Sequence, residues 1–274
     1  MEANLKAKHL ALKRNLADTG SAVLAFSGGV DSTLVLAVGR EALGDRIIAA
    51  TARSPLYPRS VVERAATLAQ RLCVEHVVLD SNELEDARFT SNPPERCYLC
   101  KRELYGRLDR LAKKRGVAAV IDGTQLDDTS DYRPGMRAAA EFGVRSPLLE
   151  VGFTKDEIRA FSKELGLDTW DIPAGPCLAS RVPYSEEITP RKLAAIEQGE
   201  QFLGELGFRE VRVRFTKDST ARIEITADCI SKLADKAVRE KVVGKMKELG
   251  FLYVTLDLEG YRTGSMNMIL ADQD

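Results

Sequence analysis

The chain has 274 residues, 44% of them apolar, which suits two domains or one large one with a sizeable core. Lysine and arginine (40) nearly balance aspartate and glutamate (41), so no net basic charge indicates binding to nucleic acid. No apolar run approaches the ~20 residues of a membrane span, and no signal-peptide segment is evident, so we expect a cytoplasmic protein without membrane contact. Five cysteines in such a chain indicate metal, redox or catalytic use before disulfides.

The N-terminal part of the chain contains a pattern typical of phosphate-binding turns. A helix over 3–17 leads into a buried strand over 22–26, two glycines follow, and a helix then runs to residue 43. Glycines let the backbone approach a ligand closely, and the free N–H groups and dipole of a helix N-terminus favour an anion. Asp31 would repel a bare phosphate, so we expect it to bind Mg²⁺ on that phosphate. The residues predicted to hold the ligand are Ser27, Gly28, Gly29, Val30, Asp31 and Ser32.

This loop contains neither the GK[ST] of a Walker A motif nor the GxGxxG of a dinucleotide site. Its sequence, FSGGVDS, resembles the SGGxDS loop of the PP-loop ATP pyrophosphatases. The resemblance implies an adenine nucleotide α-hydrolase-like fold, and it implies cleavage of ATP between the α- and β-phosphates with adenylylation of a substrate. ATP and Mg²⁺ are therefore the expected cofactors, and the loop alone indicates no particular substrate.

Strands and helices alternate beyond the loop. The apolar runs and helical stripes lie at 47–52, 60–72, 74–79, 97–115 and 117–121. This alternation predicts an α/β fold with a doubly wound parallel sheet, in which the ligand lies at the carboxyl ends of the strands. After the last of these strands, Asp122, Gly123 and Asp127 are candidate contacts to the nucleotide or Mg²⁺. A solvated acidic turn is the alternative for each carboxylate.

Three features follow before the second domain. Residues 146–149 resemble the end of another strand. Thr154 and Glu157 predict a capping box at the start of a helix that runs to residue 165. Residues 167–181 are irregular and rich in glycine and proline, which indicates a segment that is both a linker and an active-site loop.

A smaller α+β domain is predicted over 187–274, after a PP-loop domain over 1–186. Thr189 caps a helix that starts at Pro190. Apolar and charged residues alternate over 211–215 and 222–225, which indicates two half-buried antiparallel strands. A helix over 228–249 and a strand over 251–258 complete this domain.

The charged residues of this domain include candidate substrate contacts. Arg212 and Arg214 share one strand face, a geometry suited to a substrate phosphate. The alternative is a solvated sheet face with cross-strand pairing to Glu224. Glu200 and Asp228 are further acidic candidates whose roles the sequence does not define.

Two cysteine motifs carry candidate chemistry. Cys97 and Cys100 have the two-residue gap that directs both sulfurs at one metal, although a dithiol redox pair has the same spacing. Cys177 lies in a Gly–Pro loop near Arg181, where a cysteine can become a nucleophile of lowered pKa. Taken together, the three cysteines also match the ligation of a [4Fe–4S] cluster by three cysteines, in which one iron has no protein ligand. The remaining cysteines, for which we expect core packing, are Cys73 and Cys229.

Several stretches together are similar to one family. FSGGVDS, DGTQLDDTSDYRPG, PAGPCLASRVPYSEEIT and LEGYRTGSMN resemble the LarE sulfur transferases across nearly the whole chain. The resemblance implies that a carboxylate of pyridinium-3,5-dicarboxylate mononucleotide is adenylylated and becomes a thiocarboxylate, on the way to a nickel-pincer nucleotide cofactor. It makes Cys177 the sulfur-handling residue, with Asp31 and Arg181 as further catalytic candidates. Cys97 and Cys100 are typical of the branch with an iron–sulfur cluster, and family members form homohexamers.

Three other functions share parts of this pattern. A tRNA-thiolating enzyme also combines the loop with a CxxC-plus-Cys cluster, but it needs a basic face. An ATP-dependent amidotransferase or synthetase would leave the three cysteines inert. A nucleotide-binding regulator would bind ATP without releasing pyrophosphate.

Overall fold

The computed structural model describes residues 3–130, 134–173 and 175–262. The chain divides into two compact units, each described by itself below. The first unit comprises Met1–Glu83 and Glu95–Gly175, and the second comprises Leu84–Pro94 and Pro176–Asp274. No helix in the described ranges is long and apolar enough to cross a membrane.

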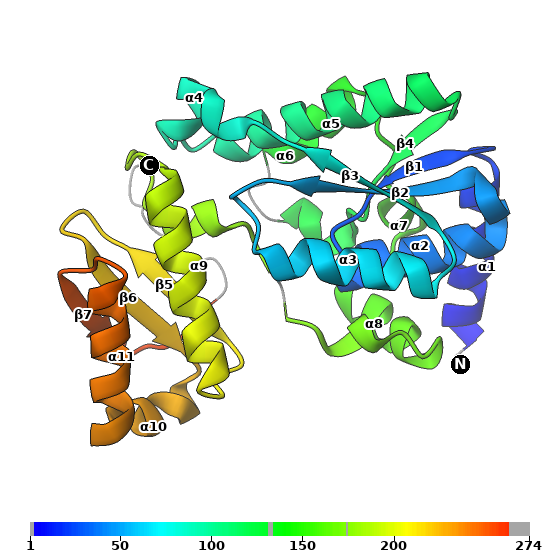
Figure 1. Ribbon diagram of the computed structural model, residues 1–274. Helices are drawn as coiled ribbons and strands as arrows, with labels where there is room; N and C mark the ends of the chain where they lie inside the picture. The colour runs from blue at the N-terminus through cyan, green and yellow to red at the C-terminus, as the bar shows by residue number, and fades with distance from the viewer. Residues whose placement is uncertain (1–2, 131–133, 174, 263–274) are drawn as a thin grey trace. The chain divides into compact units, whose positions relative to one another are not determined.

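The first unit contains a four-stranded, wholly parallel sheet with the strand order β3-β2-β1-β4. The predicted doubly wound α/β fold is therefore confirmed (Figure 1). The strands are β1 (Ala22–Ala25), β2 (Ile47–Arg53), β3 (Glu75–Asp80) and β4 (Ala119–Ile121). The long helices between them are α2 (Val30–Leu43), α3 (Arg59–Arg71) and α5 (Arg96–Arg115).

Two apolar layers cover the sheet because successive strand side chains point to opposite faces. In β2, Ile47 and Ala49 enter the core beneath α2 and α3, whereas Ile48 and Ala50 enter the core beneath α5. The helices on the first face are α1 (Ala3–Ala17), α2, α3, α7 (Pro147–Val151) and α8 (Lys155–Glu164). Those on the second face are α5 and α6 (Gly135–Glu141).

One predicted strand of this unit is wrong. Residues 147–151 form helix α7, which starts with Pro147, and Arg145 alone makes an isolated parallel bridge to Ile121. Proline lacks the N–H that a ladder needs but fits the first turn of a helix. The capping box at the start of α8 is confirmed, because Thr154 and Glu157 exchange side-chain and backbone hydrogen bonds. The short 3-10 turns are Gly44–Arg46, Glu83–Glu85, Leu126–Ser130 and Asp168–Asp171.

The second unit is built on a three-stranded sheet, β5-β6-β7, as the predicted smaller α+β domain requires. β5 and β6 are antiparallel, whereas β6 and β7 are parallel. The strands are β5 (Val211–Phe215), β6 (Thr220–Ile225) and β7 (Tyr253–Leu256). The helices are α4 (Ala87–Thr90), α9 (Pro190–Glu205), α10 (Ile230–Ala234) and α11 (Lys236–Glu248), with 3-10 turns at Leu178–Arg181 and Ala227–Cys229.

The single helix predicted over 228–249 is wrong. Asp235 has extended backbone (ψ 136°), and its carboxylate accepts hydrogen bonds from the N–H groups of Ala237 and Val238. An aspartate at such a cap starts a new helix. The chain therefore turns between α10 and α11, and both helices pack on the apolar face of the sheet.

Candidate functional site

The predicted phosphate loop follows β1 and ends at the first turn of α2. Its residues bond to one another: the Ser27 N–H donates to Ser32 Oγ, and the Gly29 N–H donates to Ser27 Oγ, each at 3.3 Å. Gly29 is the N-cap of α2, so no side chain caps the first amides of this helix. Gly28 has φ +65°, and a Cβ there would lie 3.2 Å from the Cα of Ala65. The loop can therefore offer helix N–H groups to an anion.

The end of β4 lies against the start of α2. A Cβ at Gly123 would lie 3.0 Å from the backbone N of Ser32 and 3.3 Å from the carbonyl carbon of Asp31. A side chain at this position would require the first turn of α2 to move by a few tenths of an ångström, whereas glycine fits without any shift. The structure therefore brings Gly123 next to the predicted loop residues, although they are about 90 positions apart in the sequence.

Asp122 holds the end of β4 in place. Its buried carboxylate accepts hydrogen bonds from the hydroxyls of Tyr105 (2.7 Å), Thr124 (2.9 Å) and Ser146 (2.8 Å) and from the Thr124 N–H (3.1 Å). Burial, together with the Asp122 charge, raises the pKa of Tyr105 far above its usual value, so Tyr105 is a permanent donor. In this structure Asp122 thus orients the chain that leads to Gly123.

Lys155, which the sequence analysis missed, connects the two other acidic candidates. Its ammonium Nζ lies 2.6 Å from both carboxylate oxygens of Asp31. Its backbone N–H donates to the carboxylate of Asp127 at 2.8 Å. The capping box at Thr154 predicts where α8 begins, but no local pattern indicates that the next side chain reaches α2. Asp31 and Asp127 are carboxylates of the kind that Mg²⁺ binds, so this region fits the expected metal.

The two cysteines of the CxxC motif lie near the start of α5, Cys97 as its second residue and Cys100 as its fifth. Cys97 is exposed and Cys100 is buried. The Cys100 thiol lies 3.7 Å from the Tyr57 hydroxyl and 3.7 Å from a carboxylate oxygen of Glu83. The other Glu83 oxygen is buried without a hydrogen-bond partner. The dipole of a helix N-terminus stabilises thiolates, which are metal ligands. The start of α5 can therefore bind a metal centre.

The turn that carries Cys177 belongs to the second unit. Cys177 is half-buried and precedes the 3-10 turn Leu178–Arg181. The Arg181 guanidinium is buried, and its Nη1 donates to the carbonyls of Pro176 (2.7 Å) and Cys177 (3.1 Å). Its Nε and Nη2 donate to the two carboxylate oxygens of Glu200 at 2.9 and 3.0 Å. Arg181 therefore shapes the Cys177 turn.

The predicted substrate arginines lie on the polar face of β5, and this face is buried rather than half-solvated. Arg212 and Arg214 are 8% and 6% exposed, and Glu224, opposite Arg212 in register, is 0% exposed. Arg214 donates to Glu224 (2.8 Å) and to the carbonyl of Ser180 (3.0 Å). The Cys177 turn thus helps to cover the arginines.

Arg212 lies under the C-terminal tail. Its guanidinium carbon is 4.9 Å from the ring centroid of Tyr261. Burial, and secondly the positive charge of Arg181, lower the pKa of Arg212. Gly260 is required at its position, because a Cβ there would lie 2.7 Å from the carbonyl oxygen of Ile225. Residues 263–267 of the tail motif lie outside the described residues.

Other predicted residues are placed as follows. Asp228 is exposed in a 3-10 turn. Cys73, expected in the core, is exposed in a turn with φ 52°, because the helix α3 has already ended. Cys229 is half-buried and packs against the core of the second unit. Within the described ranges, no three His, Cys, Asp or Glu side chains gather into a metal-binding group.

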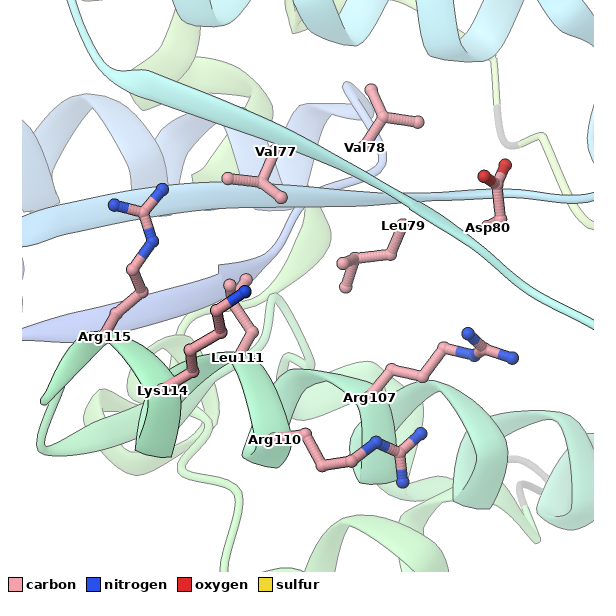
Figure 2. A pocket seen from close by; sticks show the side chains of 9 residues that line it. All are labelled: Val77, Val78, Leu79, Asp80, Arg107, Arg110, Leu111, Lys114 and Arg115. Atoms are coloured by element: carbon pink, nitrogen blue, oxygen red, sulfur yellow. The ribbon is translucent and has the colours of Figure 1, made fainter.

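Figure 2 shows an open groove between β3 and α5, with four cations from α5 along one wall. Two of them are already paired, Arg107 with Glu103 and Arg115 with Glu75. β3 is an edge strand, and the charged residues at its two ends, Glu75 and Asp80, disfavour pairing with other chains. β2 separates this groove from β1 and the phosphate loop. The lining residues are Val77, Val78, Leu79, Asp80, Arg107, Arg110, Leu111, Lys114 and Arg115.

Comparison with known proteins gives a consistent result. A family model described as NAD synthase matches residues 5–151, which include the phosphate loop. An uncharacterised protein of Synechocystis sp. is 44% identical over 97% of this chain and 99% of its own length. The pyridinium-3,5-bisthiocarboxylic acid mononucleotide synthase of Lactiplantibacillus plantarum is 39% identical over 97% of this chain and 95% of its own length. An uncharacterised protein of Methanocaldococcus jannaschii is 32% identical over 93% of this chain and 98% of its own length.

The family match covers the parallel sheet, and the full-length relatives extend across the Cys177 turn and the second unit. The protein therefore belongs to the NAD synthase-like PP-loop enzymes and, among these, to the LarE family of ATP-dependent sulfur transferases.

Proposed function

We propose that this protein uses ATP to adenylylate a carboxylate of pyridinium-3,5-dicarboxylate mononucleotide and then converts that carboxylate to a thiocarboxylate. The observation that carries the first step is the uncapped N-terminus of α2 behind the Gly28–Gly29 turn, closed on one side by Gly123. The name of the L. plantarum relative, a pyridinium-3,5-bisthiocarboxylic acid mononucleotide synthase, supports the choice of substrate.

The first step needs positioning more than acid–base chemistry. A substrate carboxylate oxygen attacks the α-phosphorus of ATP, and pyrophosphate leaves with the electron pair of the broken P–O bond. The loop amides and the helix dipole hold the phosphates, and Asp31 and Asp127 supply oxygens for Mg²⁺. The new acyl-adenylate has AMP as a good leaving group, whereas the oxygen of a free carboxylate is a poor leaving group. Attack by a sulfide at the acyl carbon then expels AMP and leaves the thiocarboxylate.

The second unit supplies groups for a substrate that carries a phosphate. Arg212 and Arg214 face the same side of β5 as the Cys177 turn, and a guanidinium binds phosphate through two parallel hydrogen bonds. Both arginines already have partners within the protein, so a substrate phosphate would add to an ordered network. Arg181 contributes by holding the backbone of the Cys177 turn.

Cys97, Cys100 and Cys177 would hold a [4Fe–4S] cluster. The residues fit this group on one point: both thiols lie near the N-terminus of α5, and beside Cys100 the buried Glu83 carboxylate has an oxygen without a partner. When bound, the cluster would supply a sulfide on the iron that has no protein ligand. Cys177 would then be spared from serving as the sulfur donor itself.

The decisive experiment is purification without oxygen, followed by iron and sulfide analysis and an assay of sulfur transfer. We expect a brown protein, and we expect Cys97→Ala, Cys100→Ala and Cys177→Ala each to lose both colour and sulfur transfer while retaining pyrophosphate release. Cys73→Ala and Cys229→Ala are matched controls that should keep the colour. If Cys97→Ala still transfers sulfur once and Cys177 loses the mass of hydrogen sulfide, Cys177 is a sacrificial donor and the cluster proposal is wrong.

The substrate is tested separately. The pyridinium dicarboxylate mononucleotide should drive conversion of ATP to AMP and pyrophosphate, and tRNA should not. Thiolated bases in a reconstituted reaction with tRNA would favour the tRNA-thiolating alternative. We further propose, from the family resemblance, that the enzyme is a cytoplasmic homohexamer. Sedimentation at several concentrations tests the assembly.

A further inference from the structure

The three most exposed large apolar side chains in the described part of the chain lie close together on the second unit. They are Leu252 (61% exposed), Tyr253 (62%) and Leu258 (79%), and they belong to strand β7 or flank it. A cluster of exposed apolar side chains is typical of an interaction site. Contact with a partner would remove this apolar surface from water, which is favourable.

β7 is also an edge strand without the usual protection. Among the described strands it pairs with β6 alone (Figure 1). Native edge strands carry charges, prolines or bulges that disfavour pairing with other chains. β3 has Glu75 and Asp80 at its ends, and β5 contains two arginines, whereas β7, Tyr253–Leu256, contains neither a charged residue nor a proline. Such an edge is suited to pairing with a further strand.

The backbone hydrogen bonds of this segment determine which residues face the open side. The Leu252 N–H donates to the carbonyl of Ser219, at the start of β6, at 2.8 Å. Because the N–H groups of a strand alternate in direction as far as its end at Leu256, those of Tyr253 and Thr255 point away from β6. Residues with outward groups exchange two N–H···O bonds when they lie opposite each other in an antiparallel pair. A second copy of β7, related by a twofold axis at Thr255, meets this condition.

The same axis brings complementary groups together. It places Leu252 of one copy opposite Leu258 of the other, so these exposed leucines cover each other. The charges also match, because the Lys247 ammonium lies at the Leu252 carbonyl, while Glu259 follows Leu258 and is 67% exposed. Each Lys247 therefore faces the Glu259 of the second copy. The net charge of −1 produces no overall repulsion between copies.

We propose that the β7 edge is a self-association surface, at which two copies of this chain join their three-stranded sheets into one six-stranded sheet across a twofold axis. The occupant is a second copy because the edge complements itself in backbone hydrogen bonds, apolar contacts and charge. This inference uses the second unit only and is independent of the proposed ATP chemistry.

The test compares Thr255→Lys with the wild type by sedimentation at several concentrations of the full-length protein. Thr255 is exposed, and the substitution places two like charges opposite each other at the axis. We expect the mass of the assembly to fall by half, whether the wild type is a dimer or a larger closed assembly joined by this contact. The control is Val78→Lys, which adds the same charge to the β3 edge at a residue that is 37% exposed, and it should leave the mass unchanged.

A second variant covers the case in which Thr255→Lys does not fold. Leu258→Lys lies outside the strand, so the sheet does not depend on this side chain. The new ammonium would face Lys247 of the second copy, and the mass should again fall by half. Thermal unfolding shows which variants are folded.

An exchange of charges identifies the partner as a second copy. Lys247→Glu and Glu259→Lys each place like charges across the axis and should raise the dissociation constant by about threefold to tenfold. The double variant restores opposite charges, so its dissociation constant should lie within about twofold of the wild-type value. A monomeric wild type, or a double variant that associates no better than the single ones, overturns the proposal. An unchanged mass in folded Thr255→Lys and Leu258→Lys also overturns it, and the edge would then belong to a different protein or to residues 263–274 of the same chain.

Discussion

The buried Arg181 and the partly buried Glu200 form a two-point ion pair, with nitrogen–oxygen distances of 2.9 and 3.0 Å. The same guanidinium holds the carbonyls of Pro176 and Cys177, and the same carboxylate accepts the N–H of Val213 at 3.1 Å. The pair thus connects the Cys177 turn, helix α9 and strand β5. Because each Arg181 nitrogen is used within the protein, we assign Arg181 a positioning role at Cys177.

The first prediction concerns this ion pair. Arg181→Met should destabilise the protein by about 3 kcal/mol, because it removes the buried guanidinium and leaves the Glu200 carboxylate, which is only 14% exposed, without its cation. Urea unfolding measures the change. The matched control is Lys245→Met, which removes an exposed pair with Glu248 and should cost less than about 0.5 kcal/mol. Equal effects of the two substitutions would show that the Arg181 pair is not the support we infer.

The parallel sheet could be predicted because its signals are local. Apolar runs such as Ile47–Ala52 read as buried strands, and the Gly28–Gly29 turn before Asp31 marks a helix start over a ligand. The contacts that complete the site are not local. Lys155 forms an ion pair with Asp31, which is 124 positions away in the sequence, and neither periodicity nor a capping pattern predicts this contact.

The errors of prediction have the same origin. The alternation of apolar and charged residues in β5 indicates that the strand has two faces. It does not indicate what covers the polar face, so the sequence does not predict that Arg212 is buried beneath Tyr261. The apolar run after Ser146 is too short to separate strand from helix by its pattern. Asp235 lies within a segment whose apolar residues have helical spacing. An aspartate there can be either the N-cap of a new helix or a solvent-facing residue of a continuous one, and the sequence does not distinguish the two.

The second prediction concerns Gly123. In Gly123→Ala the new methyl group would lie 3.0 Å from the Ser32 backbone nitrogen, so the first turn of α2 must shift. Pyrophosphate release should fall by about tenfold or more, since small displacements of positioned groups are costly. Gly244→Ala in α11 is the control, because nothing lies within 4 Å of its Cβ, and it should be neutral or stabilising. A wild-type rate in Gly123→Ala would contradict close packing of β4 against the loop.

The third prediction concerns the pH dependence of stability. The Thr51 hydroxyl donates to the Phe26 carbonyl at 2.7 Å, so its oxygen is left to accept the Nε2–H of His76 at 2.8 Å. Burial lowers the pKa of His76 below the ordinary 6.5. The unfolded chain therefore binds this proton more readily, and stability is lost as pH falls from about 6.5 through the folded pKa.

His76→Gln tests this sign. A glutamine amide can still donate to Thr51 but does not ionise, so the loss of unfolding free energy between about pH 7.5 and 5.5 should be smaller than in the wild type. Urea unfolding at the two pH values measures the difference. An identical loss in both proteins would mean that His76 takes no part in it.

The last prediction concerns recognition of the substrate phosphate by the buried arginines. Arg212→Gln should raise the KM for the mononucleotide by about tenfold to a hundredfold, the value of a charge-assisted hydrogen bond. The KM for ATP should stay within about twofold, because the first unit supplies the phosphate loop. Arg239→Gln is the control, since this arginine is exposed on α11 and donates to the Ala234 carbonyl. Steady-state kinetics with each substrate varied in turn make the comparison, after thermal unfolding has shown that both variants are folded. Should Arg212→Gln change the KM for ATP and not that for the mononucleotide, Arg212 would belong to the nucleotide site instead, and the polar face of β5 would have to be reassigned.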